Sequence, residues 1–274
     1  MEKKTVVITG ASSGIGKETA KYFAEKGWKV AATMRSPERE TELTQIENVK
    51  IYSLDVTNQE TISKTYEGIL KEFGTIDVLV NNAGYSLFGP FEISTDEQIR
   101  REFDVNVFGL FNTTRTFLKH FRENKKGIIV NVASSAGKTT LPFISTYNST
   151  KFAVEGFTES LSYELNDFGI KVKLIEPGVI KTDFTGRSMD HAKSETITDY
   201  NASLSNFYSL ATGDSQQISS EPTLVAEVIY EAVTDGTNTL RYIAGEDAKQ
   251  AISIRETQGD EAYVSMIKER FALK

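Results

Sequence analysis

Short apolar runs alternate with longer amphipathic segments along most of this chain. The runs cover residues 6–8, 30–33, 49–54, 76–80, 128–132 and 172–175, with a further run at 240–243. They are apolar nearly throughout, which is typical of strands that are covered on both faces. The segments between them repeat apolar residues at intervals of three and four, which indicates helices. This alternation predicts a parallel β-sheet with crossover helices.

The helical segments cover residues 17–26, 59–73, 96–123, 152–168 and 223–233. Gly27, Gly74, Gly127 and Gly169 each follow one of them, where a left-handed residue often ends a helix. Because crossovers between parallel strands are right-handed, the pattern predicts a doubly wound, three-layer α/β sandwich, the Rossmann fold. Its ligands bind beyond the carboxyl ends of the strands.

The length and spacing of the pattern predict a single domain over residues 1–274. No linker rich in proline, glycine or serine divides the chain. A polar stretch at 183–221 interrupts the pattern, and we interpret it as a substrate loop, with a simple surface excursion as the alternative. Residues 247–273 are predicted to be a helical C-terminal extension, whose role the sequence does not indicate.

Composition excludes several kinds of site. The net charge is −7 and the basic residues are scattered, so we expect neither nucleic acid nor an anionic membrane as a partner. The chain has no cysteine and only two histidines, which argues against a metal site and a thiol nucleophile. The lack of cysteine fits a cytoplasmic protein. No apolar run approaches the length of about 18 residues needed for membrane insertion.

A glycine-rich turn follows the first predicted strand at residues 9–16. Gly10, Gly14 and Gly16 permit a tight turn and a close backbone approach, and the turn opens directly into a helix. Amide groups at such a helix start bind a pyrophosphate, and the hydroxyl of Ser12 or Ser13 adds a donor. The pattern is weak by itself, since a plain strand-turn-helix junction has the same glycines. Its position at the first βα junction favours a dinucleotide site.

Arg35 indicates which dinucleotide. A carboxylate at the end of the second strand would accept a hydrogen bond from the ribose 2′-hydroxyl of NAD, but here the strand ends in Arg35 and the next carboxylate is Glu38. A guanidinium pairs with the 2′-phosphate of NADP. We therefore predict NADP(H) as the cofactor, with a solvated cation at a strand end as the alternative.

Tyr147 and Lys151 stand four residues apart, so on a helix their side chains share one face. A nearby ammonium favours the phenolate, which lowers the pKa of a tyrosine. Ser134 follows the predicted strand 128–132, at the edge where ligands bind. A serine there donates a hydrogen bond to an oxygen that gains negative charge. The three side chains together suit the reduction of a carbonyl group.

Six motifs in order and register carry a resemblance to a known family. They are Gly10-x-x-x-Gly14-x-Gly16, Asn81-Asn-Ala-Gly84, Asn106, Ser134, Tyr147-x-x-x-Lys151 and Pro177-Gly178. Over about residues 5–182 the chain resembles the short-chain dehydrogenase/reductase family. Within it, the chain is similar to the hydroxysteroid and retinol dehydrogenase-like branch of carbonyl reductases that prefer NADP.

The resemblance implies roles for the catalytic residues. Tyr147 would be the general acid in reduction and the base in oxidation, with Lys151 lowering its pKa and binding the nicotinamide ribose. Ser134 would hold the substrate oxygen, and Asn106 would place a water that links Lys151 to solvent. Plainer roles remain open: Asn106 as a helix cap or kink, Pro177-Gly178 as a turn, and Ser135 in place of Ser134.

The resemblance also implies the cofactor site. Besides Tyr147 and Lys151 it comprises Gly10, Ser12, Ser13, Gly14, Ile15, Gly16, Arg35, Asp55, Val56, Asn82, Ala83, Gly84, Pro177, Gly178, Val179, Ile180 and Thr182. Asp55 and Val56 would lie against the adenine. Residues 178–182 would flank the nicotinamide carboxamide.

The candidate substrate residues are largely apolar. Beside Ser134 and Tyr147 they are Leu141, Phe143 and Phe184, and no cationic cluster stands among them. We therefore expect a lipophilic ketone or aldehyde, or the corresponding alcohol, although aromatic residues in such a fold are often packing residues. The alternatives are an NAD-linked alcohol dehydrogenase of the same fold and a non-catalytic sensor that binds NADPH. Family members often pair through the helices that carry Asn106 and Lys151, which makes a homodimer or homotetramer an expectation here.

Overall fold

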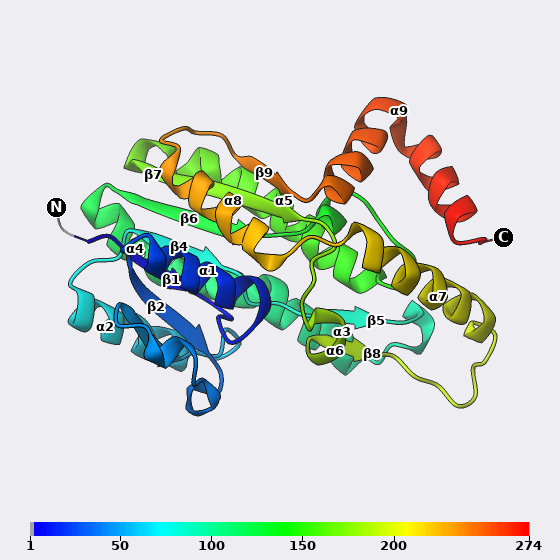
Figure 1. Ribbon diagram of the computed structural model, residues 1–274, viewed down its shortest axis with the longest axis horizontal. Coiled ribbons are helices and arrows are strands. Elements are labelled where there is room, and N and C mark those ends of the chain that lie inside the picture. The colour runs from blue at the N-terminus through cyan, green and yellow to red at the C-terminus, as the bar shows by residue number, and fades with distance from the viewer. Residues whose placement is uncertain (1–2, 274) are drawn as a thin grey trace.

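The computed structural model describes residues 3–273 and contains a seven-stranded parallel sheet (Figure 1). Its strand order is β3-β2-β1-β4-β6-β7-β9. The strands are β1 (Thr5–Ile8), β2 (Lys29–Met34), β3 (Val49–Ser53), β4 (Val78–Asn81), β6 (Gly127–Val132), β7 (Ile170–Pro177) and β9 (Arg241–Ala244). The direction of build reverses between β1 and β4, so the carboxyl ends of these two strands form the ligand-binding edge of a doubly wound sheet. The predicted fold is confirmed.

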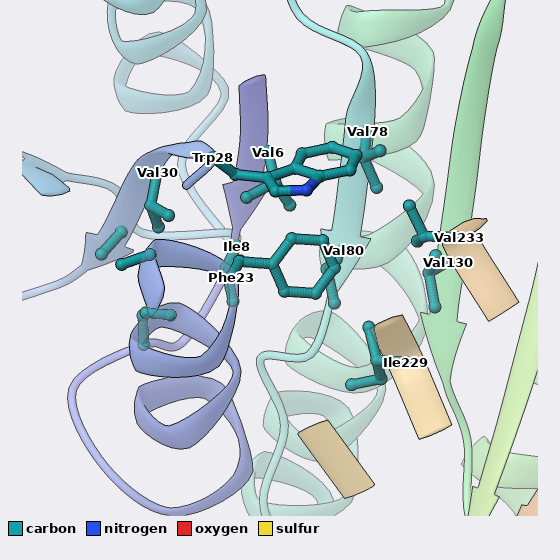
Figure 2. Packing of buried hydrophobic residues seen from close by; sticks show 14 of the residues in the cluster. Val6, Ile8, Phe23, Trp28, Val30, Val78, Val80, Val130, Ile229 and Val233 are labelled. Carbon is teal, nitrogen blue, oxygen red and sulfur yellow. The ribbon is translucent and has the colours of Figure 1, made fainter. Parts of the chain in front are cut away.

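Helices α1 (Gly14–Glu25) and α8 (Pro222–Thr234) cover one face of the sheet (Figure 1). Side chains of alternate strand positions, such as Val6 and Ile8, pack against them. Figure 2 shows the aromatic centre of this layer, where the rings of Phe23 and Trp28 meet edge to face at 5.1 Å. This layer holds α1 and α8 against the sheet.

Helices α2 (Gln59–Phe73), α4 (Leu110–Asn124) and α5 (Ser145–Leu165) pack on the opposite face. Val7 and Leu79 point to this side, as the two-residue period of a strand requires. Between the two faces the central strands β1 and β4 are buried at every position, which explains their apolar sequence.

The predicted helix 96–123 consists of three joined parts. Helix α3 (Asp96–Phe103) begins with a capping box between Thr95 and Gln98, passes into a π-helical turn, Asp104–Gly109, and continues as α4. π-helical turns occur frequently at functional sites. Helix α5 begins at Ser145, earlier than predicted, so Tyr147 lies in its first turn.

Three of the four predicted helix-ending glycines have the expected positive φ, namely Gly27, Gly74 and Gly169. The prediction for Gly127 is wrong. Lys125 takes the left-handed position after α4, with φ 48°. Gly127 instead opens β6, where a Cβ atom would lie 2.4 Å from the ring of Phe121, so this glycine is required by packing.

The segment 183–221 folds as α6 (Phe184–Arg187), β8 (Met189–His191) and α7 (Asn201–Ile218). Strand β8 pairs with β5 (Ser86–Phe88) in a second, two-stranded sheet. The chain ends with α9 (Glu246–Arg270), which is kinked at Gly259 and forms a bent arm beside α7 (Figure 1). No helix within residues 3–273 combines the length and the apolar character needed to cross a membrane.

Candidate active site

The glycine turn lies where β1 meets α1 and leaves a cradle at the start of the helix. Gly10 has φ 68°, and a Cβ atom there would lie 2.9 Å from the Cα of Ala83. A Cβ at Gly16 would lie 2.5 Å from the Nδ2 atom of Asn82. Ser13 is the N-cap of α1, but its side chain makes no capping hydrogen bond. The first amides of α1 are therefore available to an anion, as a dinucleotide pyrophosphate requires.

Hydrogen bonds join the end of β4 to this turn. The Thr9 hydroxyl accepts hydrogen bonds from the amides of Asn82 at 2.9 Å and Ala83 at 3.1 Å. The side-chain amide of Asn82 donates to the carbonyl oxygens of Thr9 and Gly10 at 2.9 and 3.2 Å. These contacts keep the predicted cofactor residues of the 82–84 segment next to the glycine turn.

The segment after β7 lies on the other side of the turn. A Cβ at Gly14 would be 3.1 Å from Thr182, which places residues 177–182 against the start of α1. The amide of Val179 donates a 2.7 Å hydrogen bond to Asp247 at the beginning of α9. The same carboxylate leaves no room for a Cβ at Gly178. The glycine after Pro177 is thus needed for this close approach.

Arg35 is exposed at the carboxyl end of β2. Within residues 3–273 no salt bridge or hydrogen bond of its guanidinium is found. Asp55 and Val56 follow β3: the Asp55 carboxylate binds the amide and hydroxyl of Thr57 at 2.9 and 2.8 Å. The Val56 side chain is 7% exposed and packs against Gly109 of the π-helical turn. A ligand at this position would therefore contact mainly the Val56 backbone.

Ser134, Tyr147 and Lys151 come together beyond the ends of β6 and β7. The Ser134 hydroxyl accepts from the amide of Ala136 at 3.1 Å and is hydrogen-bonded to the Tyr147 phenol. The Lys151 ammonium lies 5.6 Å from the centre of the Tyr147 ring and donates to the carbonyl oxygen of Val132 at 3.1 Å. Ser134, rather than Ser135, is the serine that the fold brings to the tyrosine.

The electrostatics of this group differ from the expectation that Lys151 lowers the pKa of Tyr147. Burial raises the pKa of Tyr147 to about 12, although the Ser134 hydrogen bond lowers it. Burial also lowers the pKa of Lys151 to about 8, against the opposing effect of Glu102 and Glu155. Desolvation penalises both charged forms and is the largest contribution to each shift. At neutral pH Tyr147 is therefore a phenol, the form that donates a proton.

Asn106 lies in the π-helical turn and is 2% exposed. Its Oδ1 accepts from the amide of Tyr85 at 3.0 Å, and its Nδ2 donates to the Tyr85 carbonyl and to the Thr150 hydroxyl. A Cβ at Gly84 would lie 3.1 Å from the Asn106 Oδ1 and 3.9 Å from the Lys151 Nζ. Asn106 thus connects the 84–85 segment to the turn of α5 that precedes Lys151.

Apolar side chains lie beside the tyrosine. The ring of Phe184 meets that of Tyr147 at 6.1 Å. Leu141 and Phe143 belong to a cluster with Phe88 of β5, Phe207 of α7 and, from the C-terminal arm, Tyr263, Ile267 and Phe271. Phe143 has φ 64°, a strained conformation of the kind found at functional sites. The C-terminal extension therefore packs on the predicted substrate residues.

Sequence reasoning missed three residues that the fold brings to this site: Thr9, Asp247 and Glu102. Thr9 could have been found from the sequence, because it stands at the end of the first predicted strand, where its hydroxyl can bind the end of the neighbouring strand. Asp247 reaches the site only through the long α9 connection. Glu102 is completely buried near Lys151, although α3 reads as a polar helix. No group of three or more metal-ligating side chains occurs among residues 3–273.

The sequence model of the short-chain dehydrogenase family matches residues 4–193. This chain belongs to that family. The match covers the glycine turn, Asn106 and the Ser134, Tyr147 and Lys151 group.

Curated relatives align over most of the chain. The uncharacterized oxidoreductase YusZ of Bacillus subtilis is 35% identical and covers 98% of this chain and 99% of its own length. The retinol dehydrogenase 8 of Bos taurus is 33% identical, over 87% of this chain and 80% of its own. The similarity to retinol dehydrogenase-like members of the family is confirmed.

Solved structures agree with the fold. A short-chain dehydrogenase from Streptomyces avermitilis superposes with a TM-score of 0.85 at 31% identity, covering 97% of this chain and 95% of that one. The protein ElxO with NADP bound has a TM-score of 0.73 at 32% identity, over 88% and 97%. A 3-ketoacyl-(acyl-carrier-protein) reductase from Brucella melitensis, complexed with NADH, has 0.75 at 27% identity, over 90% and 99%.

Proposed function

We propose that this oxidoreductase uses NADP(H) to reduce a lipophilic ketone or aldehyde to an alcohol, or catalyses the reverse reaction. The observation that carries the proposal is the convergence of Ser134, Tyr147 and Lys151 at the sheet edge that also holds the glycine cradle. Acid, oxyanion donor and ammonium stand together beside an anion site.

Each side chain has a distinct task in this proposal. NADPH, when bound, supplies the hydride. Tyr147 gives its phenolic proton to the carbonyl oxygen, and Ser134 donates a hydrogen bond to the same oxygen as negative charge develops. Lys151 holds its positive charge near the phenol and stabilises the phenolate that remains. In oxidation the same phenolate takes the proton back.

Arg35 supports NADP(H) over NAD(H). Its guanidinium is exposed at the end of β2, beside the glycine turn, where a carboxylate would otherwise select the ribose hydroxyl. ElxO, which binds NADP, and the Brucella reductase, which was found with NADH, share the fold, so the fold alone does not determine the cofactor. We base the preference on Arg35 and on the geometry of its surroundings.

The apolar cluster around Phe88, Phe143 and Phe207 supports a lipophilic substrate. On the far side of Phe88, between β8 and α7, a groove of about 430 Å³ is lined by Leu204, Tyr208 and other residues. A substrate with an extended apolar part would lie along this cluster and reach towards the groove. The bovine relative is named as a retinol dehydrogenase, in keeping with such a substrate class.

The state of assembly and the location are also proposals. Phe108 and Phe152, on the helical stretch that carries Asn106 and on α5, are 52% and 40% exposed, which favours pairing of two chains through these helices. A molar mass in solution of twice 30.5 kDa, measured by light scattering, would support a homodimer. The absence of cysteine suits the cytoplasm, and cell fractionation tests this location.

The function is tested by measuring oxidation of NADPH and NADH at 340 nm across a panel of aromatic, aliphatic and steroidal ketones and of aldehydes. We expect turnover that is faster with NADPH and with the more apolar compounds. Faster turnover with NADH would instead indicate the NAD-linked alcohol dehydrogenase. Tight NADPH binding without turnover on any compound would contradict the reductase and indicate a sensor.

A further inference from the structure

Glu102, on the last turn of α3, carries a completely buried carboxyl group beside the active site. Its Oε1 accepts a 2.7 Å hydrogen bond from the amide of Leu87. Its Oε2 is buried and has no hydrogen-bond partner among the described residues. A buried carboxyl oxygen without a partner is costly, so its retention calls for a functional explanation.

Glu102 and Asn106 together hold strand β5. They are four residues apart along the helix, and they accept from the amides of Leu87 in the strand and of Tyr85 just before it. Alternate amides of a strand point to the same side. The amide between them, that of Ser86, points the other way and donates to Ser188 beside β8. The carboxyl of Glu102 is thereby fixed next to the catalytic Asn106.

The same helix also holds β8. The Gln98 side chain donates to Asp190 and to the carbonyl oxygen of His191 at 3.3 and 3.2 Å, and Arg101 forms an ion pair with Asp190. Both strands of the small sheet are therefore anchored on one face of α3. Glu102 occupies the innermost of these anchoring positions, the only one of the three that is buried.

Four titratable groups interact electrostatically with Glu102, besides the backbone amide that fixes it. Lys151 and Tyr147 approach from α5, Tyr85 from the segment before β5, and Asp190 from β8. Strand β5 itself carries no titratable side chain. On its own helix, the neighbouring Arg101 is turned to Asp190 and Tyr85. Lys151 is thus the cation on which Glu102 acts in the catalytic group.

Building on the proposed reductase function, we propose that Glu102 is a positioning residue of the active centre: its buried carboxyl group acts on Lys151 and helps to keep it an ammonium as the solution becomes alkaline. The structure supports this role because the carboxyl group is buried, is held by the Leu87 amide and lies one helical turn from Asn106, which together with Lys151 flanks Gly84.

The direction of the effect follows from the signs of the interactions. Burial raises the pKa of Glu102 to about 8, so the group is largely neutral at pH 7 and ionised above pH 8. Once ionised, it raises the pKa of both Lys151 and Tyr147. Tyr147 stays a phenol throughout this range because its pKa is about 12, so the effect on Lys151 is the one that matters: the ionised carboxylate delays the loss of the ammonium. Glu102 therefore extends reductive activity towards higher pH.

The first test compares the pH dependence of kcat/KM for ketone reduction in wild type, Glu102→Gln and Glu97→Gln. Glutamine can still accept the Leu87 hydrogen bond but cannot ionise. We expect Glu102→Gln to match wild type near pH 6.5 and to fall about 3- to 10-fold below it above pH 8.5, a shift of roughly half to one pH unit. Glu97, an exposed carboxylate on the same helix, provides the matched control and should change nothing.

A purely structural role of Glu102 predicts that the three profiles coincide, and that result would overturn the proposal. The second test does not depend on turnover. In protein labelled with ¹³C at the glutamate carboxyl, the resonance lost in Glu102→Gln should titrate above pH 7, and at still higher pH in Lys151→Met. An ordinary glutamate midpoint near 4.5 would refute the inference whether or not the chain proves to be a reductase.

Discussion

Arg35 is the residue on which cofactor choice depends in this account. Its neighbours explain why it is available: it is exposed at a strand end, and no carboxylate of the described chain pairs with it. A hydrogen bond to a charged group contributes about 1.5–3 kcal/mol. In the proposed function, one arginine would therefore give a preference for NADP(H) of roughly 10- to 100-fold.

We predict that Arg35→Asp lowers the ratio of kcat/KM for NADPH to that for NADH by about 10- to 100-fold or more, because the 2′-phosphate loses its cation and meets a negative charge. Initial rates with both cofactors give the ratio. Arg39→Asp is the matched control, since Arg39 is exposed nearby and its side chain is 80% accessible. An equal loss in both variants would show that only the general field matters and would contradict the role of Arg35.

Residue chemistry also shows where sequence reasoning reached its limit. The sequence placed Tyr147 and Lys151 on one helical face, and α5 has them there. It also suggested that the ammonium depresses the pKa of the tyrosine, whereas burial raises it to about 12. The degree of desolvation depends on the packing of distant segments, which a spacing of four residues does not reveal.

At the scale of elements, α5 carries more than Tyr147 and Lys151. Glu155, one turn beyond Lys151, is buried beside Glu176 of β7, and both meet Arg241 of β9. Burial, together with the nearby Glu176 carboxyl, raises the pKa of Glu155 to about 8. Burial raises the pKa of Glu176 as well. The pair therefore retains a proton at neutral pH, and α5 is tied to β7 and β9 through it.

This pair predicts a pH-dependent stability. A carboxyl whose pKa is raised in the folded state stabilises the protein below its unfolded pKa, near 4.5, and this stability is lost as pH rises to about 8. Glu176→Gln removes one of the two titrating groups. At pH 8.5 we expect this variant to unfold at a higher temperature than wild type, with a free energy of unfolding about 1–2 kcal/mol larger. At pH 5.5 we expect little difference between the two proteins.

Glu159→Gln serves as the control for this prediction. Glu159 binds the same arginine from a largely exposed position, and its hydrogen bonds to Arg241 and Tyr163 lower its pKa. Its removal should destabilise slightly and equally at both pH values. If thermal unfolding gave Glu176→Gln the same small loss at both, the shared proton would be refuted.

The small sheet of β5 and β8 could not be predicted from the sequence. Each strand has only three residues, and the partners are about 100 positions apart, so neither period nor length marks them. For a related reason, the burial of Glu102 could not be predicted. The sequence of α3 is almost entirely polar, and the burial of this one carboxyl arises because β5 docks against the helix.

At the scale of the whole molecule, the layered architecture explains why the main sheet and its ligand-binding edge could be predicted from the sequence. Every central strand is covered on both faces, so its sequence is continuously apolar and its boundaries are set by the glycine turn and helix ends. The carboxyl edge of the sheet then assembles residues from positions 10 to 182, and Asp247 of α9 holds the segment after β7 in place. The periphery, α7 and α9, contributes the apolar wall, and its placement depends on side-chain packing alone.

The most direct test of the central claim is the turnover of NADPH and a responsive ketone by Tyr147→Phe, with binding of NADPH followed by fluorescence. Removal of the hydroxyl should lower kcat by about 10²- to 10⁴-fold while NADPH binding remains, since the ring still packs against Phe184. Tyr163→Phe, on the exposed side of the same helix, should be as active as wild type. A Tyr147→Phe protein that kept wild-type turnover would contradict the account.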